Sequence, residues 1–177
     1  MRQTRRKLSR REQQQAANIL SRKLSQNPSF KFATRIALYL ANDGEVNTQL
    51  AIQQAWQRGQ TIYLPTLHPI RKGFLWFVEY RPNSPMRTNR FGITEPDPKH
   101  NKRIAPRFLQ VVGLPLVAFD SQGNRLGMGG GFYDRSFEFC RQAGTKPKLF
   151  GLAHQCQQVE ALPLESWDIQ LEDIISA

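Results

Sequence analysis

Residues 36–65 read IALYLANDGEVNTQLAIQQAWQRGQTIYLP, and this stretch decides the fold. The continuous apolar run at 36–41 is typical of a buried strand, and the Asn-Asp-Gly turn behind it ends that strand. Apolar residues at helical spacing follow between Thr48 and Gly59, which predicts a helix. A second apolar run at 61–64 predicts another strand, which we expect Pro65 to stop. Strand, helix and strand within about 30 residues form a βαβ unit, in which the strands are parallel and the crossover is right-handed.

The same alternation continues on both sides of this unit. Ser9 and Glu12 fit a capping box, and the apolar spacing behind them predicts a helix over 9–26. Residues 81–107, rich in Pro, Asn, Lys and Arg, are expected to form a long surface excursion. The remaining patterns predict strands at 74–78, 111–119, 149–153 and 169–175, and a helix at 133–142. We expect Pro115 to interrupt the strand over 111–119 near a bend. The sequence therefore predicts one α/β domain over residues 1–177, with a mostly parallel sheet and helices on both faces.

Length and composition are those of a globular protein. The chain has 177 residues, of which 40% are apolar and 22% are charged. No apolar run approaches the ~20 residues of a membrane span, and no apolar signal segment follows the basic N-terminus. The two cysteines are too few for a disulfide scaffold. We therefore expect a cytoplasmic protein that does not bind a membrane.

The positive charge of the chain is unevenly distributed. The formal net charge is +11, and the first 35 residues hold ten Lys or Arg against a single acid, Glu12. A second stretch, from Arg71 to Arg107, holds nine basic residues against three acids. Such a distribution favours a polyanionic partner, which could be nucleic acid, nucleotide phosphates or a polycarboxylate. A solvated helix face that binds nothing explains the same charges.

The most informative segment for function is NRLGMGGGFYDR, residues 124–135. Four glycines in five positions stand between a predicted strand and a predicted helix, where they permit positive φ and close approach of backbone N–H groups to a ligand. The helix N-terminus adds donors and partial positive charge, so the segment predicts a phosphate cradle. Arg125 and Arg135 flank it, and Asp134 is placed to hold a metal that bridges phosphates. The alternative is a tight turn without a ligand.

Other candidate residues carry weaker signals. The three histidines lack metal-ligand spacing, and neither cysteine has a local activating signature. Glu45 follows the first strand of the βαβ unit, where it either binds a ligand or complements the next helix electrostatically. Asp168 fits a turn residue equally well. Trp76 and Phe77 alternate on a predicted strand, so at least one of them is expected in the core.

The segment Arg125–Arg135 resembles the signature of the 5-formyltetrahydrofolate cyclo-ligase family, also called methenyltetrahydrofolate synthetases. Supporting pieces occur in the same order as in that family and span nearly the whole chain. They are the basic first helix, Leu40 with 43–48 (DGEVNT), 63–65 (YLP), 91–96 (FGITEP), 115–120 (PLVAFD), and 162–163 (LP) with 167–168 (WD). The resemblance implies a fold like that of ribose-5-phosphate isomerase and CoA transferases.

The resemblance also implies a reaction and a set of site residues. The family converts 5-formyltetrahydrofolate and ATP to 5,10-methenyltetrahydrofolate, ADP and phosphate with Mg²⁺, through a phosphorylated formyl group that N10 attacks. By resemblance, the ATP contacts are Arg125, Leu126, Gly127, Met128, Gly129, Gly130, Gly131, Phe132 and Tyr133. The implied folate contacts are Leu40, Glu45, Met128, Gly129, Gly130, Gly131 and Phe132, and the implied Mg²⁺ ligands are Asp134 and Asp168. Arg2 and Arg6 are nearest to the Lys-x-x-x-Arg that touches phosphate in the family, and Phe132 stands where Tyr is more common.

Two rival functions remain from the residues alone. A nucleic-acid-binding module would use the basic helix and the aromatic residues, but it would leave the glycine segment with Asp134 unexplained. A sugar-phosphate enzyme on the same fold should carry a carboxylate and Lys pair near the glycines, and no such Lys is there. We therefore expect a monomer that binds 5-formyltetrahydrofolate and ATP and does not bind nucleic acid.

Overall fold

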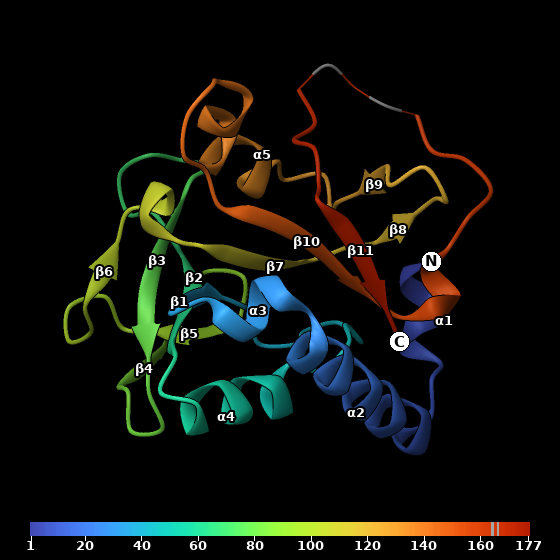
Figure 1. Cartoon of the computed structure of the whole chain (residues 1–177), viewed down its shortest axis with the longest axis horizontal. Coiled ribbons are helices and arrows are strands. Elements are labelled where there is room, and N and C mark those ends of the chain that lie inside the picture. Colours follow the sequence, from blue (N-terminus) through green and yellow to red (C-terminus); the bar gives the residue numbers. More distant parts are fainter. Residues whose placement is uncertain (164, 166) are drawn as a thin grey trace.

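The computed structural model describes residues 1–163, 165 and 167–177, and it is an α/β fold built on a seven-stranded sheet (Figure 1). The order of the strands is β11-β10-β7-β1-β2-β3-β6. These strands are β1 (Arg35–Ala37), β2 (Thr61–Leu67), β3 (Leu75–Tyr80), β6 (Arg103–Ile104), β7 (Val111–Pro115), β10 (Lys148–Ala153) and β11 (Asp173–Ser176). Neighbours from β11 to β2 pair in parallel, and β3 and β6 extend the edge in antiparallel pairing. The prediction of a mostly parallel sheet is confirmed.

The βαβ unit forms, but its first strand ends at Ala37 instead of residue 41, and its second strand is longer than expected. Helix α4 (Gln49–Gln57) connects β1 to β2, and Ile36 pairs with Ile62 in parallel register. The prediction that Pro65 stops the strand is wrong, because β2 runs on to Leu67 and pairs with β3. The carbonyl of Tyr63 faces β1, so the nitrogen of Pro65 faces the same side, beyond the last residue of β1. Its missing N–H therefore removes no hydrogen bond from the sheet.

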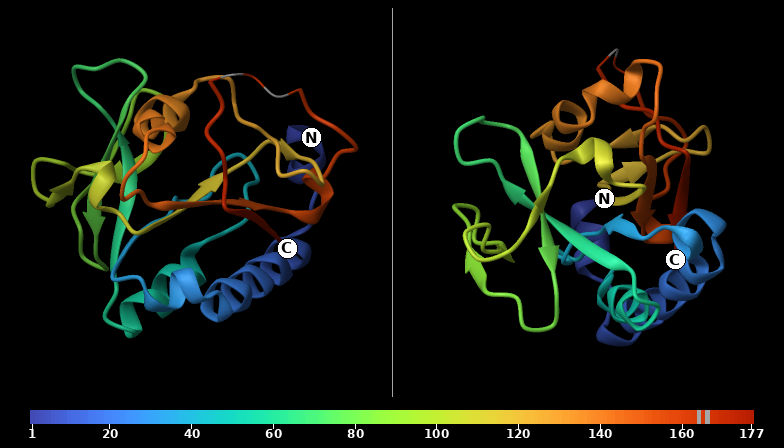
Figure 2. Two further views of the ribbon diagram at one scale, coloured as in Figure 1. Left: turned by 45° about the horizontal axis from the view of Figure 1, so that its top comes forward. Right: turned by 60° about the vertical axis from the view of Figure 1, so that its left-hand side comes forward.

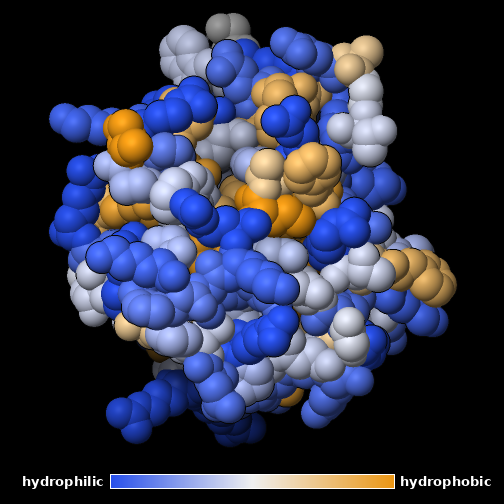
Figure 3. Space-filling view, turned by 90° about the vertical axis from the view of Figure 1, so that its left-hand side faces the viewer, coloured by the Kyte–Doolittle hydropathy of each residue, from blue (hydrophilic) through white to orange (hydrophobic). Residues whose placement is uncertain are grey.

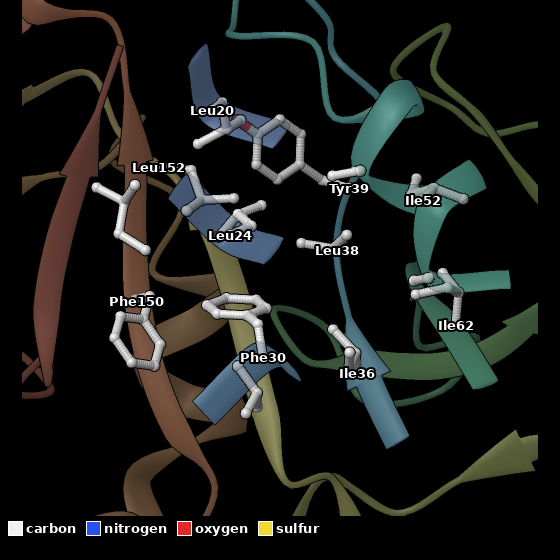
Figure 4. Packing of buried hydrophobic residues seen from close by; sticks show 14 of the residues in the cluster. Leu20, Leu24, Phe30, Ile36, Leu38, Tyr39, Ile52, Ile62, Phe150 and Leu152 are labelled. Atoms are coloured by element: carbon white, nitrogen blue, oxygen red, sulfur yellow. The ribbon is translucent and has the colours of Figure 1, made fainter. Parts of the chain in front are cut away.

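Helices cover both faces of the sheet, as Figures 1 and 2 show. On one face lie α2 (Arg10–Gln26), α3 (Pro28–Phe32) and α4, and on the other lies α5 (Phe132–Ser136). Helix α2 begins with the predicted capping box, since Ser9 and Glu12 exchange hydrogen bonds. Figure 4 shows the core under α2, to which Leu20, Leu24, Phe30, Ile36, Leu38, Tyr39, Ile52, Ile62, Phe150 and Leu152 contribute. The opposite core includes Phe77, Leu114, Phe137 and Leu149.

Several predicted element boundaries are wrong. The helix expected over 133–142 ends at Ser136 and continues only as a 3₁₀ turn, Glu138–Arg141, because the backbone leaves helical geometry at the fully buried Phe137. The strand expected over 111–119 is interrupted at its proline as predicted: β7 ends at Pro115, and a two-residue strand, β8 (Ala118–Phe119), follows and pairs with β9 (Arg125–Leu126). The last strand starts at Asp173 rather than at 169.

The excursion at 81–107 has more structure than its sequence predicts. It contains the hairpin of β4 (Met86–Thr88) and β5 (Thr94–Pro96), then β6 and a 3₁₀ turn, Pro106–Phe108. The buried carboxylate of Glu95 ties this hairpin to the sheet. It accepts hydrogen bonds from Arg87 at 2.7 and 3.0 Å, from Asn89 at 2.9 Å and from the backbone N–H of Leu67 at 3.2 Å. Among the residues described, no helix is both long and apolar enough to cross a membrane.

Candidate active site

A buried arginine joins three segments beyond the carboxyl ends of the parallel strands. Arg5 lies on α1 (Arg2–Arg6) and its side chain is fully buried. Its Nε donates to the backbone oxygen of Asp43 at 2.8 Å, and its Nη1 donates to the backbone oxygen of Leu116 at 2.8 Å. Arg5 therefore fastens the N-terminal helix to the loop after β1 and to the turn after β7, at the edge where α/β sheets bind ligands.

Asp43 is the centre of an arginine cluster. It adopts a φ of 54°, its carboxylate accepts from Arg2 at 2.7 Å and from Arg5 at 3.1 Å, and it also bonds Arg6. Burial opposes ionisation of this carboxyl, but the hydrogen bonds from Arg2 and Arg6 lower its pKa to about 2. The structure thus brings Arg2 and Arg6 to the site edge, with about half of each side chain exposed and with Asp43 as their partner.

Arg5 was not identified as a site residue from the sequence. Residues three apart share one helix face, so Arg5 lies beside Arg2 on α1, but no local pattern distinguishes it from the other arginines of this basic helix. We expect Arg5→Met to lower the free energy of unfolding by about 2–4 kcal/mol, since two buried carbonyls and Asp43 lose a donor. Urea denaturation measures this change. The matched variant Arg2→Met, with a half-exposed side chain, should cost about 0–1 kcal/mol. Equal losses in the two variants would show that Arg5 does not hold the segments together.

Glu45 is buried on the loop beside this cluster. Its Oε2 accepts the backbone N–H of Asn42 at 3.0 Å, and its Oε1 lies 3.8 Å from Arg5 Nη2. Burial raises the pKa of Glu45 to about 6. Helix α4 begins at Gln49, so Glu45 lies outside its first turn, where a helix-terminus charge acts most strongly. Leu40, the other implied pterin contact, is half-buried against the core under α2.

The charge of Glu45 acts on two tyrosines. Burial, and then the negative charge of Glu45, raise the pKa of Tyr133 well above its usual value. The same two causes raise the pKa of the buried Tyr39, and Tyr133 contributes there as well. The electrostatic effect of Glu45 therefore extends from the loop after β1 to Tyr133, at the end of the glycine segment.

The glycine loop, residues 127–131, is open to solvent. Gly129 has a φ of +82° and Gly131 a φ of +57°, conformations that L side chains rarely adopt. A Cβ built at Gly127 or Gly129 meets no atom within 4 Å. The exposed Met128 stands between these two glycines. Arg135 links the loop to the segment before β3, because it donates to the backbone oxygen of Gly130 and, at 3.0 Å, to that of Gly73.

The expected strand-to-helix setting of this loop is partly wrong. The loop follows the short, largely exposed strand β9 rather than a buried strand. Helix α5 behind it has only five residues, so its dipole contributes less positive charge than the sequence predicted. Backbone N–H groups and arginines therefore have to supply most of the attraction for an anion.

Asp134 lies against the segment that carries Asp168. Asp134 forms an ion pair with Arg125, and its Oδ1 accepts the backbone N–H of Ile169 at 3.4 Å. Arg125 also donates to the backbone oxygen of Ile169. Asp168, one residue earlier, accepts the backbone N–H of Glu165 at 3.0 Å. Both carboxylates are hard oxygen donors of the kind that Mg²⁺ takes as ligands.

The hairpin β4–β5 borders the end of the glycine loop, a contact that the sequence did not predict. The ring of Phe91 meets the ring of Phe132 edge to face, with centroids 6.2 Å apart. The excursion at 81–107 therefore reaches the glycine loop and narrows its surroundings.

Comparisons with known proteins agree with this geometry. The model of the 5-formyltetrahydrofolate cyclo-ligase family matches residues 1–177. The chain belongs to this family of enzymes. A 5-formyltetrahydrofolate cyclo-ligase from Escherichia coli K12 is 42% identical over 176 residues, which cover 99% of this chain and 96% of that protein. A cyclo-ligase of the same name from Haemophilus influenzae is 44% identical over 162 residues, 92% of this chain and 81% of that protein.

Solved structures of two methenyltetrahydrofolate synthetases share the fold of this chain. The 5,10-methenyltetrahydrofolate synthetase of Aquifex aeolicus superposes with a TM-score of 0.81 at 27% identity, covering 99% of this chain and 84% of that one. The 5,10-methenyltetrahydrofolate synthetase of Mycoplasma pneumoniae shares the fold with a TM-score of 0.75 at 22% identity, covering 98% and 92%. The family and the α/β fold of the cyclo-ligases predicted from the glycine signature are therefore confirmed.

Proposed function

We propose that the chain catalyses the ATP- and Mg²⁺-dependent cyclisation of 5-formyltetrahydrofolate to 5,10-methenyltetrahydrofolate, with release of ADP and phosphate. The observations that carry this proposal are the open glycine loop, the ion pair of Asp134 and Arg125 directly behind it, and the buried Glu45, whose charge raises the pKa of Tyr133 at the end of that loop. One site would thereby hold both the folate ring and the phosphates. The family membership supports the same reaction.

The residue roles follow the family's pattern. The proposed ATP contacts are Arg2, Arg6, Arg125, Leu126, Gly127, Met128, Gly129, Gly130, Gly131, Phe132 and Tyr133. The proposed folate contacts are Leu40, Glu45 and the segment from Met128 to Phe132. Asp134 and Asp168 would hold Mg²⁺, which neutralises phosphate charge when bound. Residues 1–177 would act as one domain and as a monomer in the cytoplasm.

The chain itself has to position the reactants rather than react with them. The formyl oxygen of the substrate takes the γ-phosphoryl group of ATP, and the bond between that phosphorus and ADP breaks. N10 of the folate then attacks the formyl carbon and releases its N–H proton to solvent, and the carbon–oxygen bond breaks to release phosphate. Both nucleophiles belong to the substrate, so no activated Ser, Cys or His is needed. In agreement, burial raises the pKa of the Cys140 and Cys156 thiols, which disfavours their reactive form.

Arginines and loop backbone supply the electrostatics of the proposed transfer. The N–H groups of the glycine loop approach phosphate without obstruction, because no Cβ stands at Gly127 or Gly129. Arg125 is held by Asp134 and Ile169 in the site wall, so its charge is positioned before the reaction. The buried Glu45 would accept hydrogen bonds from the pterin and fix the orientation of the formyl group.

Direct measurement of product formation tests the proposal. The protein is mixed with 5-formyltetrahydrofolate and Mg-ATP, and the absorbance of the methenyl product is followed. We expect the product to form only when both ATP and Mg²⁺ are present, with one ADP for each product molecule. Absence of the product, or its formation without ATP, would overturn the proposal.

Glu45→Gln separates folate binding from general stability. A carboxylate accepts two adjacent N–H donors of an aminopyrimidine edge, whereas an amide can accept with only one of its two ends. We expect folate binding to weaken by about tenfold or more, because a buried donor of the pterin loses its partner. ATP affinity and the melting temperature should change little. Titrations of this variant with folate and with ATP measure the two affinities, and a thermal melt measures its stability. Unchanged folate affinity would show that Glu45 does not contact the folate.

The raised pKa of Glu45 gives the site a pH dependence. Only the ionised carboxylate accepts both pterin donors, so folate affinity is expected to fall as pH drops through about 6. The contribution of Glu45 to folding stability changes with pH in the opposite direction. The pKa of Glu45 in the folded protein lies above its ordinary value of 4.5, so Glu45 contributes stability below about pH 4.5 that is lost as pH rises through about 6. Folate titrations between about pH 5 and 8 should show this step in the wild type but not in Glu45→Gln. A step that persists in the variant would assign it to another group.

A further inference from the structure

A cluster of buried polar side chains lies beyond the carboxyl ends of β7 and β10, beside α1 (Figure 1). Its members are Arg5, His154 and Gln157, and each is at most 2% exposed. The hydrophilic side chains on the side of the molecule that carries β3 and β6, which faces the viewer in Figure 3, lie in contact with solvent instead. Burial of a polar group costs free energy unless the group has partners, so the partners of these three side chains show what they hold in place.

The proposed reaction gives no role to His154. This residue follows β10, and its Nε2 lies 3.2 Å from the backbone oxygen of Gly44, 110 residues away in sequence. Burial lowers the pKa of His154, so its imidazole is neutral near pH 7 and carries a single proton. Because a carbonyl oxygen can only accept a hydrogen bond, that proton has to be on Nε2. His154 therefore donates to the loop after β1.

Gln157 holds His154 in turn. Its Oε1 accepts the backbone N–H of His154 at 2.8 Å, and its Nε2 donates to the backbone oxygen of Leu116 at 2.6 Å. The same oxygen of Leu116 accepts from Arg5 at 2.8 Å. The three buried side chains thus join the ends of β7 and β10 to the loop after β1, and the imidazole is in position before a substrate binds.

The oxygen that His154 contacts belongs to the peptide group that leads into Glu45. The N–H of this peptide group donates to the backbone oxygen of Asn42 at 3.0 Å, so the group is held at both of its ends. Gln13 also approaches the oxygen of Gly44, at a longer distance of 3.4 Å. A peptide group is planar, and its orientation sets the direction in which the next side chain leaves the backbone. The hydrogen bond from His154 therefore helps to decide where the carboxylate of Glu45 points.

The part of the loop before this peptide group is held by other contacts. Gly44 has a φ of +74°, and a Cβ built there would lie 3.2 Å from backbone atoms of Arg5 and Arg6, so α1 packs closely against it. Arg5 also donates to the backbone oxygen of Asp43 at 2.8 Å. Loss of the donor on His154 should therefore release the peptide group before Glu45 and leave Asp43 in place.

We propose that His154 is a positioning residue of the folate site, which orients the carboxylate of Glu45 toward the pterin by donating from Nε2 to the backbone oxygen of Gly44. The inference rests on the proposed function, in which Glu45 binds the pterin. Without the donor, the carboxylate samples orientations in which it does not meet the pterin, and binding has to select the competent one. Folate affinity then falls, although no group that touches folate or ATP has been removed.

Two substitutions at one position separate the hydrogen bond from the packing. The side chain of Gln places its amide nitrogen as many bonds from Cβ as Nε2 of histidine, so His154→Gln keeps a donor that His154→Leu removes. We expect His154→Leu to bind 5-formyltetrahydrofolate about five- to tenfold more weakly, and His154→Gln to stay within about twofold of the wild type. ATP affinity should change by less than about twofold in both variants. Titrations with each ligand measure these affinities, and an equal loss of folate affinity in the two variants would overturn the inference.

Gln60→Leu is the matched control for the loss of a buried donor. Gln60 is buried just before the amino end of β2, at the edge of the sheet opposite to the site, and its Nε2 donates to the backbone oxygens of Phe30 and Ala33 at 2.8 and 2.6 Å. This variant should lower the melting temperature as His154→Leu does, but keep the folate affinity of the wild type. A similar loss of folate affinity in Gln60→Leu would show that the effect reports stability and not positioning.

A double variant tests whether His154 acts through Glu45. In Glu45→Gln the carboxylate is already lost, so adding His154→Leu should weaken folate binding by less than about twofold more. If the two losses multiply instead, to about fiftyfold or more, His154 acts independently of Glu45 and the inference is overturned.

The wild-type protein gives a test even if His154→Leu does not fold. ¹⁵N NMR of the imidazole near pH 7, with the signal of His154 assigned by its loss in His154→Gln, reports which ring nitrogen carries the proton. We expect the proton on Nε2, and a proton on Nδ1 alone would overturn the inference. Failure of the proposed function is a different result, because the wild type would then form no methenyl product. If the wild type forms product and His154→Leu binds folate equally well, the positioning inference alone fails.

Discussion

Gly129→Val is expected to abolish measurable ATP binding while the protein stays folded. Gly129 has a φ of +82°, which a β-branched residue does not adopt without strain, so the loop backbone has to move. A Cβ at this position meets no protein atom within 4 Å, so the rest of the fold tolerates the change. The obstruction would fall instead on a phosphate approaching the loop. An ATP titration by calorimetry and a thermal melt of the variant measure the two effects.

A second glycine provides the matched control for this variant. Gly123, in the turn between β8 and β9, has a φ of +84° and an equally open Cβ position. Gly123→Val therefore introduces the same kind of strain outside the proposed cradle. It should keep ATP binding and show a similar loss of stability. If both variants bind ATP as the wild type does, the glycine loop is not a phosphate cradle.

Asp134→Asn is expected to lower turnover by about 10²-fold or more and to raise the Mg²⁺ concentration needed for half-maximal rate. The amide keeps an acceptor for the N–H of Ile169, which the carboxylate accepts at 3.4 Å, but it loses the charge that a divalent cation requires. Asp168→Asn should have an effect of the same sign and similar size. Rates measured over a range of Mg²⁺ concentrations at saturating ATP test both variants.

The ion pair with Arg125 offers another explanation for such a loss. If Asp134 acts only by holding Arg125, two results are expected. Arg125→Met should lower turnover as much as Asp134→Asn does. Asp134→Asn should keep the Mg²⁺ dependence of the wild type. Asp173→Asn, at the exposed start of β11, serves as the control for loss of a carboxylate elsewhere. A wild-type Mg²⁺ dependence in both Asp134→Asn and Asp168→Asn would remove the two aspartates as ligands.

The fold could be predicted where local patterns agree with tertiary packing. The apolar runs before Asn42 and after Gly59 lie in adjacent parallel strands, and the capping box at Ser9 begins α2 as expected. Each of these signals lies within a few residues of the element that it predicts. Pro65 was misjudged because its effect depends on which neighbouring strand its nitrogen faces, and that information is not local.

The site was only partly predictable for the same reason. The glycine signature identified the loop, and the positive φ of Gly129 and Gly131 agrees with it. The burial of Arg5 depends on contacts with Asp43 and Leu116, which lie 38 and 111 residues away in sequence. A basic helix predicts exposed charge, so no local pattern revealed that one arginine of this helix is the anchor of the site.

The transfer of the formyl oxygen to phosphate tests the central claim most directly. The wild-type protein is given 5-formyltetrahydrofolate labelled with ¹⁸O in the formyl group, together with Mg-ATP, and the released phosphate is analysed by mass spectrometry. If ATP phosphorylates the formyl oxygen before N10 attacks, each phosphate released with the methenyl product carries one ¹⁸O atom. Methenyl product accompanied by unlabelled phosphate would contradict this account.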